Sequence, residues 1–367
     1  MKSICFVSTF AYPQFNPDSG GSIGGAEKQQ QILAKELVSR DCSVYFVVGD
    51  YKQEPVEIIE GIKFIKSETA KRRNNLWNIR RTYFSLAGAM KKADADVYVQ
   101  RANPFYTGQV AFWCKTNRKR FVYFTGHDSN CDLSILADPM NLFVRKAYEY
   151  GLKRADKIIV QTDTQRKLLE ENFGLKSVVV RSLFVKHELS ETEEDPDPEK
   201  VIFVGSLTPK KRPDLFIELA SHFPEVEFEL IGSGEGKYFN DILAMANGVR
   251  NVKFRGTLRD EELETAFLSA SALVLTSSAE GFPNVFLEAW HHGTPIISLK
   301  IDPDGFLSTR GGGLLAESRE ELQLCLKKLL KDSGKREELI KNGRTVLGNE
   351  FDFGKSVDSI VTHLGLE

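Results

Sequence analysis

The segment 279–288 has the residue types and spacing of an anion-binding turn flanked by two carboxylates. Pro283 suits the first turn of a helix, because its missing N–H would be unpaired there anyway. Glu280 then precedes the helix, while Asn284 and Glu288 lie four residues apart on one face of it. Free amides at a helix N-terminus attract an anion such as a diphosphate. The carboxylates suit the hydroxyls of a ribose and a sugar, although a capped helix with solvated acids explains the segment alone equally well.

A basic turn follows another apolar run. Gly205 ends the run 201–204, and Lys210, Lys211 and Arg212 come shortly after it. A lysine at such a position can neutralise a phosphate as a point charge. The alternative is a solvated turn without a ligand.

Glycines are concentrated in two further loops. The segment 20–27 reads GGSIGGAE, and its glycines let the backbone approach a ligand closely at a helix start. It comes about ten residues after its strand and lacks the spacing of a dinucleotide fingerprint. Gly232 opens a second glycine turn, after the run 227–231, where either a nucleotide base or a plain tight turn fits.

His127 lies shortly after the apolar run 121–124, beyond Thr125 and Gly126. A histidine beyond the carboxyl end of a strand points toward the usual ligand position of an open α/β sheet. Asp128 is placed to orient it. A lone histidine is otherwise more often structural.

Short apolar runs alternate with helical patterns along the whole chain, which predicts the α/β class with parallel sheets. Expected strands in the first half are 4–9, 44–48, 96–100, 121–124 and 157–160, with a helix at 24–40. The pattern restarts with 201–204, 227–231, 252–254, 272–276 and 295–298. We therefore expect two Rossmann-like domains that face a central cleft.

An acidic, proline-bearing segment, 187–199, is the best candidate for the linker between them. The expected domains are 1–186 and 187–350. A last helical stretch, 351–367, is expected to complete the first domain.

The motifs together resemble one family. Glu280-Gly281-Phe282-Pro283-x4-Glu288, followed by Gly293-Thr294-Pro295, is similar to the paired-glutamate signature of retaining glycosyltransferases of family 4, which have the GT-B fold. The resemblance implies that Glu280 contacts the donor sugar and Glu288 the ribose. It implies that the backbones of Gly281, Phe282 and Asn284 hold the sugar and the phosphates.

The same resemblance extends over most of the chain. It implies that Lys211, in the loop after Gly205, binds the diphosphate of a nucleotide-sugar co-substrate, and that Gly24 and Gly25 border the donor phosphate and the acceptor. It places His127 near the reacting sugar. Ser206 stands where the family commonly has an arginine, so Lys210 or Arg212 would have to supply the second positive charge.

The resemblance implies no cofactor and no essential metal. Asp94-Ala95-Asp96 and Asp195-Pro196-Asp197 mimic a metal-binding Asp-x-Asp motif, but the first precedes a strand and the second lies in the expected linker. His291-His292 lacks ligand partners at metal-binding spacing and is expected to pack or face solvent.

Charge is distributed unevenly along the chain. Residues 1–190 carry 29 Lys and Arg against 20 Asp and Glu, whereas the remainder carries 20 against 31. The basic segments 71–92 and 115–120 favour contact with an anionic membrane surface, with an ordinary surface helix as the alternative, and apolar and aromatic residues are interleaved with the charges of the first segment. No nucleic-acid recognition motif accompanies the charge.

The five cysteines have irregular spacing and contain no Cys-x-x-Cys pair, which favours reduced thiols. No apolar stretch approaches the length of about 20 residues of a membrane helix. We expect a cytoplasmic protein, with possible contact at the inner face of the membrane.

The function that fits best is a retaining glycosyltransferase that moves a sugar from a nucleotide-diphosphate sugar to a hydroxyl on a glycan or lipid-linked acceptor, in the synthesis of envelope polysaccharide, lipopolysaccharide or glycolipid. The alternatives are a phosphorylase or nucleotide-sugar epimerase of the same fold, and a non-catalytic nucleotide-sugar-binding protein. The sequence does not name the base, the sugar or the acceptor.

Overall fold

The computed structural model describes residues 2–20, 24–67, 76–136, 140–188 and 197–366, and only the backbone of 76–79 and 197–199. The chain divides into two compact units. Unit 1 comprises Met1–Leu183 and Phe353–Glu367, and unit 2 comprises Phe184–Asp352. Parts of the expected glycine loop (21–23), the basic cluster 71–73 and most of the expected linker (189–196) lie outside the described residues.

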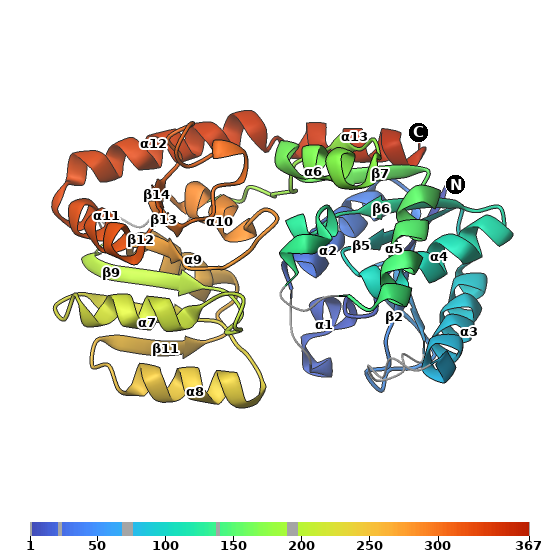
Figure 1. The fold of residues 1–367 in the computed structure, drawn as a ribbon, viewed down its shortest axis with the longest axis horizontal. Coiled ribbons are helices and arrows are strands. Elements are labelled where there is room, and N and C mark those ends of the chain that lie inside the picture. Colours follow the sequence, from blue (N-terminus) through green and yellow to red (C-terminus); the bar gives the residue numbers. More distant parts are fainter. Residues whose placement is uncertain (1, 21–23, 68–75, 137–139, 189–196, 367) are drawn as a thin grey trace. The chain divides into compact units, whose positions relative to one another are not determined.

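Unit 1 is built on an eight-stranded sheet (Figure 1) in the order β3-β4-β2-β1-β5-β6-β7-β8. Its strands pair in parallel except for the antiparallel β3 and β4. The strands are β1 (Ser3–Val7), β2 (Ser43–Val48), β3 (Val56–Ile59), β4 (Ile62–Lys66), β5 (Val97–Arg101), β6 (Arg120–Phe124), β7 (Lys157–Val160) and β8 (Val178–Val179). The β3–β4 hairpin is absent from the sequence-based expectation. Its turn uses Glu60 and Gly61, both with positive φ, as two-residue hairpins require.

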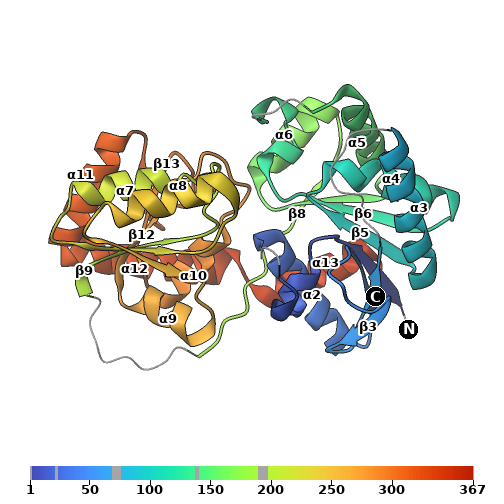
Figure 2. The same cartoon turned by 90° about the horizontal axis from the view of Figure 1, so that it is seen from below.

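Helices cover both faces of this sheet. They are α1 (Tyr12–Phe15), α2 (Gly25–Ser39), α3 (Leu76–Ala93), α4 (Pro104–Thr116), α5 (Leu142–Arg154), α6 (Asp163–Phe173) and α13 (Phe353–Leu364). Figure 2 shows α2 and α13 on one face and α3 to α6 on the other. Because side chains alternate along a strand, Ile4 and Phe6 of β1 pack with α2 and α13, while Cys5 and Val7 pack with α3 to α5.

Unit 2 has a six-stranded, entirely parallel sheet in the order β11-β10-β9-β12-β13-β14. Its strands are β9 (Asp197–Val204), β10 (Glu227–Ile231), β11 (Val252–Gly256), β12 (Ala270–Leu275), β13 (Ile296–Leu299) and β14 (Leu314–Ala316). Asp197 belongs to β9, so the expected linker ends earlier than residue 199. The apolar stretch of β12 is buried along its whole length, as a strand covered on both faces requires.

The helices of unit 2 again form two layers. They are α7 (Pro213–Ser221), α8 (Gly236–Asn247), α9 (Asp260–Leu268), α10 (Asn284–His292), α11 (Arg319–Lys331) and α12 (Ser333–Glu350). Figure 2 shows α7, α8 and α11 on one face of the sheet and α9, α10 and α12 on the other. None of the described helices in either unit combines the length and apolar character that a membrane crossing needs.

One aromatic residue fixes the position of α10, which begins at the segment singled out in the sequence. Trp290 is 2% exposed and donates a hydrogen bond from Nε1 to the Gly312 carbonyl at 2.7 Å. Its ring packs against those of Phe286, Phe306 and Phe351. Gly343 of α12 faces the same ring so closely that a Cβ there would collide with it. A glycine at this position therefore lets α12 approach α10.

A matched pair of substitutions on α12 tests this packing. Gly343→Ala is expected to lower the free energy of unfolding by about 1–3 kcal/mol, because the added methyl overpacks the Trp290 site. Gly348→Ala meets nothing within 4 Å and is expected to raise it by up to about 1 kcal/mol, through helix propensity. Urea unfolding monitored by circular dichroism measures both. Equal effects of the two substitutions would contradict the packing argument.

Candidate functional site

The sequence-predicted residues of unit 2 gather where the strand order of its sheet reverses. From β9 the chain proceeds outward through β10 and β11, and then returns to the other side of β9 with β12. The loops that leave the carboxyl ends of β9 and β12 therefore diverge at this point. In open α/β sheets this switch point is where ligands bind.

The loop 205–212, which follows β9, is held by residues that follow β12. Thr276 Oγ1 donates to the carbonyls of Lys211 at 3.1 Å and Arg212 at 2.8 Å. The Ser278 N–H and hydroxyl both donate to the Lys210 carbonyl, at 2.8 and 3.0 Å. The backbone that carries these three basic side chains is therefore fixed by four hydrogen bonds from the neighbouring loop.

A buried ion pair joins the same two loops. Lys211 Nζ lies 2.5 Å from Glu280 Oε1, and Glu280 is 6% exposed. Burial by itself raises the pKa of the Glu280 carboxyl, but the charge of Lys211 and its hydrogen bond outweigh this effect, with a further contribution from Lys210. The resulting pKa lies below the ordinary value of 4.5, so Glu280 is ionised at neutral pH.

Arg212 is engaged locally. It adopts a left-handed conformation with φ of 51° and binds both carboxylate oxygens of Asp214, from Nε at 3.1 Å and from Nη2 at 2.8 Å. Asp214 also accepts from the Tyr238 hydroxyl at 2.9 Å. Of the two residues expected to stand in for the arginine missing at Ser206, only Lys210 contributes to the electrostatics of Glu280.

Gly205 and Gly232 lie against each other at the ends of β9 and β10. Gly232 has a φ of 145°, and a Cβ on it would collide with the Gly205 carbonyl oxygen. The Gly205 N–H donates to the Ile231 carbonyl at 3.0 Å, and the Gly232 N–H donates to the Gly256 carbonyl at 2.7 Å. The glycine at 232 is thus required by this close backbone approach, whether or not a base binds there.

The segment 280–288 forms a buried turn and the first turns of α10. Pro283 is the N-cap, one residue before the position expected from the sequence. The Phe282 side chain packs in the aromatic cluster with Phe286 and Phe351, which leaves its backbone as the part available to a ligand. Asn284 and Glu288 are half-buried and lie one turn apart on α10.

Gly24, Gly25 and His127 belong to unit 1 and occupy the corresponding edge of its sheet. The strand order there reverses between β1 and β5. Gly24 is the N-cap of α2, which begins at Gly25. The carboxylate of Glu27 folds over Gly24 so closely that a Cβ at residue 24 would collide with it.

Arg101 is a charged residue of this edge that the sequence analysis missed. It closes β5 and is half-buried, and desolvation of its guanidinium lowers its pKa to about 10 against the opposing charge of Glu27. Burial raises the pKa of Glu27, opposed by its own backbone amide and by Arg101. An arginine that ends the apolar run 97–100 was the available signal, because a charge is rarely buried without a partner.

His127 follows β6 as expected and is half-buried. It is the N-cap of a short 3-10 helix, Asp128–Asn130. The Asn130 side-chain oxygen accepts hydrogen bonds from the N–H groups of Gly126 and His127, both at 3.0 Å. Asp128 accepts from Gln165 Nε2 at 3.0 Å. The backbone of His127 is therefore held firmly at the carboxyl end of its strand.

The structure places residues of the three motifs that the sequence analysis discounted as metal sites. Asp96 accepts from the Ser3 N–H and hydroxyl, at 2.9 and 2.7 Å, and so lies at the amino ends of β1 and β5. Asp197 begins β9. No ligand partner stands at metal-binding spacing from His291 and His292 in the sequence, but the fold brings His187 beside both. Residue 187 is far from them in sequence, which is why spacing did not indicate it.

Two family models match consecutive parts of the chain. The Glycosyltransferase Family 4 model matches residues 23–188, and the model for glycosyl transferases group 1 matches residues 185–346. Together they span both units. The protein belongs to family 4 of the glycosyltransferases.

The relatives with curated descriptions are distant. An uncharacterized glycosyltransferase of Haemophilus influenzae is 26% identical over 88% of this chain and 88% of its own length. A Campylobacter jejuni N-acetylgalactosaminyltransferase that acts on an undecaprenol diphosphate-linked glycan is 22% identical over 88% and 89%. An uncharacterized glycosyltransferase of Methanocaldococcus jannaschii, MJ1178, is 27% identical over 58% of this chain, and the match spans only 60% of that protein.

Solved structures define the fold. Sucrose-phosphate synthase from Thermosynechococcus elongatus superposes with a TM-score of 0.79 at 15% identity, covering 99% of this chain and 98% of its own. HepE of Anabaena, in complex with UDP and glucose, superposes with a TM-score of 0.76 at 17% identity, covering 100% of both chains. The chain has the GT-B fold.

The Lys211–Glu280 pair predicts a pH-dependent effect of Lys211→Met. In the wild type the pKa of Glu280 is lower in the folded state than its ordinary value of 4.5. The stability that results is fully present above pH 4.5 and is lost as the pH falls through the folded-state pKa. In the variant the buried carboxylate lacks its main cation, so unit 2 is expected to lose about 1–3 kcal/mol at neutral pH. This deficit shrinks as the pH falls, because a protonated Glu280 no longer needs the cation.

Urea unfolding at pH 7 and at the lowest pH where both proteins stay folded measures the effect. Lys237→Met, at an exposed position of α8, is the matched control. A deficit that is independent of pH, or one that the control shares, would contradict the assignment.

Proposed function

We propose that the protein is a retaining glycosyltransferase that transfers a sugar from a nucleotide-diphosphate sugar to a hydroxyl of a lipid-linked or envelope glycan. The observation that carries the proposal is the Lys211–Glu280 pair at the switch point of unit 2. A cation and an ionised carboxylate held side by side in a largely buried position suit a ligand with a diphosphate next to sugar hydroxyls.

The donor is proposed to bind along the loops after β9 and β12. Lys211 and Lys210 face the diphosphate, and the amides at the start of α10 add the partial positive charge of a helix N-terminus. Glu280 accepts hydrogen bonds from sugar hydroxyls. Glu288, one turn into α10, accepts from the ribose hydroxyls.

The proposed reaction is a front-face displacement. The bond between the anomeric carbon and the diphosphate oxygen breaks, and the bond to the acceptor oxygen forms on the same face. The acceptor hydroxyl gives its proton to the departing diphosphate oxygen, so no protein nucleophile is required. Lys211 and the helix amides stabilise the charge that develops on the diphosphate. Glu280 keeps the sugar in place while the bonds exchange.

UDP-sugars are the first donors to test, because the structural relative HepE is described with UDP and glucose. A donor that binds the native state raises its apparent stability. A thermal-shift screen of UDP-, GDP-, ADP- and CMP-sugars therefore identifies the base without knowledge of the acceptor.

The acceptor side is proposed to contact an anionic membrane surface through a groove on unit 1. The groove has a volume of about 380 Å³ and is lined by residues of α3, α4 and α5. Phe84 and Phe143 at this groove are 64% and 57% exposed. A relative acts on an undecaprenol-linked glycan, and a lipid-linked acceptor would bring the enzyme to such a surface.

Exposed cations on the same helices support this partner. Arg80 lines the groove, and Lys115 and Lys146 are exposed on α4 and α5. Within the expected basic segment 115–120, two residues serve structural contacts instead. Lys119 pairs with Asp94 at 2.9 Å, and Arg120 donates to the His363 carbonyl at 2.8 Å.

Glu288→Ala is expected to weaken binding of the preferred sugar nucleotide by about tenfold to a hundredfold, because a charged hydrogen-bond partner of the ribose is lost. Isothermal titration calorimetry measures the affinity. The control is Glu225→Ala, at an exposed position before the amino end of β10, which should leave it unchanged. An unchanged affinity for every sugar nucleotide in the Glu288 variant would overturn its role.

Incubation of the wild type with the preferred donor, with and without phosphate, separates the alternatives. An epimerase changes the sugar and a phosphorylase consumes phosphate, each without a second sugar acceptor. The proposed transferase is expected neither to change the sugar nor to consume phosphate at the rate at which it transfers sugar to its acceptor.

The double variant Phe84→Ser and Phe143→Ser is expected to reduce binding to anionic phosphatidylglycerol vesicles at least about tenfold, through lost apolar insertion. Co-sedimentation measures the bound fraction. Leu324→Ser is the control, because Leu324 is 66% exposed on α11 of unit 2. The membrane contact would be contradicted if the wild type did not bind the vesicles. It would also be contradicted if the double variant bound them as well as the Leu324→Ser control does.

A further inference from the structure

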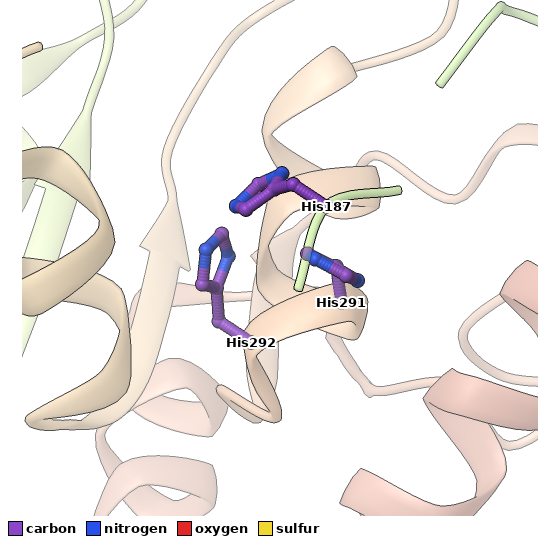
Figure 3. Close-up of side chains that lie close together, drawn as sticks. All are labelled: His187, His291 and His292. Atoms are coloured by element: carbon purple, nitrogen blue, oxygen red, sulfur yellow. The ribbon is translucent and has the colours of Figure 1, made fainter. Parts of the chain in front are cut away.

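Three imidazoles lie together in unit 2 (Figure 3). His291 and His292 are the last two residues of α10, and His187 comes from the non-helical segment 184–188 that opens the unit. The candidate ligand nitrogens of the three residues all lie within 4.8 Å of one another. The ring centroids are 4.6 Å apart for His187 and His291, 5.0 Å for His291 and His292, and 5.4 Å for His187 and His292.

The hydrogen bonding of His292 defines its tautomer. Its Nδ1 lies 2.7 Å from the Glu288 carbonyl oxygen, which can only accept. Nδ1 therefore carries the proton, and Nε2 has the free lone pair. Metal-binding histidines are oriented in the same way, with the second ring nitrogen donating to a carbonyl or carboxylate.

The lone-pair nitrogen of His292 lacks a partner within the described part of the chain. His292 is 5% exposed, and its Nε2 is buried without a hydrogen bond there. The Nε2 of the half-buried His291 is in the same condition. Two adjacent, buried and unsatisfied acceptors cost free energy in a folded protein and call for an explanation.

Ordinary core packing does not supply that explanation. An apolar side chain at 292 would pack against Phe267, which the His292 ring stacks on at 5.3 Å, without the cost of an unsatisfied nitrogen. Burial and the neighbouring imidazoles of His292 and His187 lower the pKa of His291 to about 4. The imidazole of His291 is therefore neutral at physiological pH, which is the form that binds metals.

We propose that His187, His291 and His292 bind a divalent transition metal ion of the zinc class. Three neutral imidazoles suit Zn²⁺ and its neighbours in the first row. Zn–N bonds of about 2.0–2.1 Å place tetrahedral ligand atoms about 3.3 Å apart. The three nitrogens must therefore draw closer together to bind one ion, and the exposed side chain of His187 on a non-helical segment allows this.

A carboxylate lies beside one of the three histidines, His187. Glu264 of α9 places Oε2 4.0 Å from His187 Nε2, and its side chain is 13% exposed. The remaining ligand is this carboxylate or a water molecule. A site of three histidines and one such ligand has the composition of known zinc centres.

The ion would join the beginning of unit 2 to the end of α10. The carbonyl of Glu288, on the same helix, orients His292. The other end of α10 begins within the candidate donor segment 280–288. The metal therefore has a structural role, in holding α10, and takes no part in the transfer chemistry. This inference does not depend on the proposed function.

The test uses the full-length chain without a histidine tag, freed of metal by chelation. Calorimetric titration with ZnCl2 is expected to show one site with micromolar or tighter affinity, and saturation is expected to raise the melting temperature. His187→Ala should weaken binding about tenfold to a hundredfold and reduce the rise in melting temperature at the same zinc concentration. His222→Ala, at an exposed histidine of the same unit, should behave as the wild type.

His187 is suited to the test because its exposed side chain can be removed without a cavity. Co²⁺ provides a second readout, since a tetrahedral imidazole site gives visible absorption bands that the His187 variant should lose. Zinc binding that is absent from the wild type, or that persists unchanged in His187→Ala, overturns the proposal. Persistence would assign the ion to the cysteines or to the surface.

Discussion

The candidate site of unit 2 depends on one buried ion pair. Glu280 is nearly fully desolvated, and an isolated carboxylate in such a position would be protonated. Lys211 prevents this from a loop that is 69 residues away in sequence. The pair and the hydrogen bonds from Thr276 and Ser278 join the loops after β9 and β12. If either loop moved away, the buried carboxylate of Glu280 would lose its cation. The same constraint presents a cation and an ionised acid together at the switch point.

Unit 1 repeats this arrangement with different residues. The strand order of its sheet also reverses beside its first strand, and a half-buried arginine, Arg101, interacts electrostatically with the acid Glu27 at that edge. Glycines border the acid in unit 1, as they border the basic loop in unit 2, because in both places a Cβ would meet neighbouring atoms. Each unit therefore has its own paired charges and close backbone approach at the carboxyl edge of its sheet.

Helix α10 connects several properties of unit 2. Its N-terminus is the candidate donor segment, its middle is fixed by the aromatic cluster around Trp290, and its C-terminus carries His291 and His292. Gly343 allows α12 to approach it. Glu288 lies on the same helix, which has only nine residues.

The amino-acid sequence by itself determined the two α/β units and most of their strands, because strands buried on both faces must be continuous apolar runs that end at polar loops. It also located 280–288, Lys211 and His127 after strands, where such sheets bind ligands. Strand order and side-chain packing decided the rest, and neither is encoded by local spacing. They pair Lys211 with Glu280, turn Phe282 into the core, and bring His187 to His291 and His292. Residues tens of positions apart meet only when the sheet has formed.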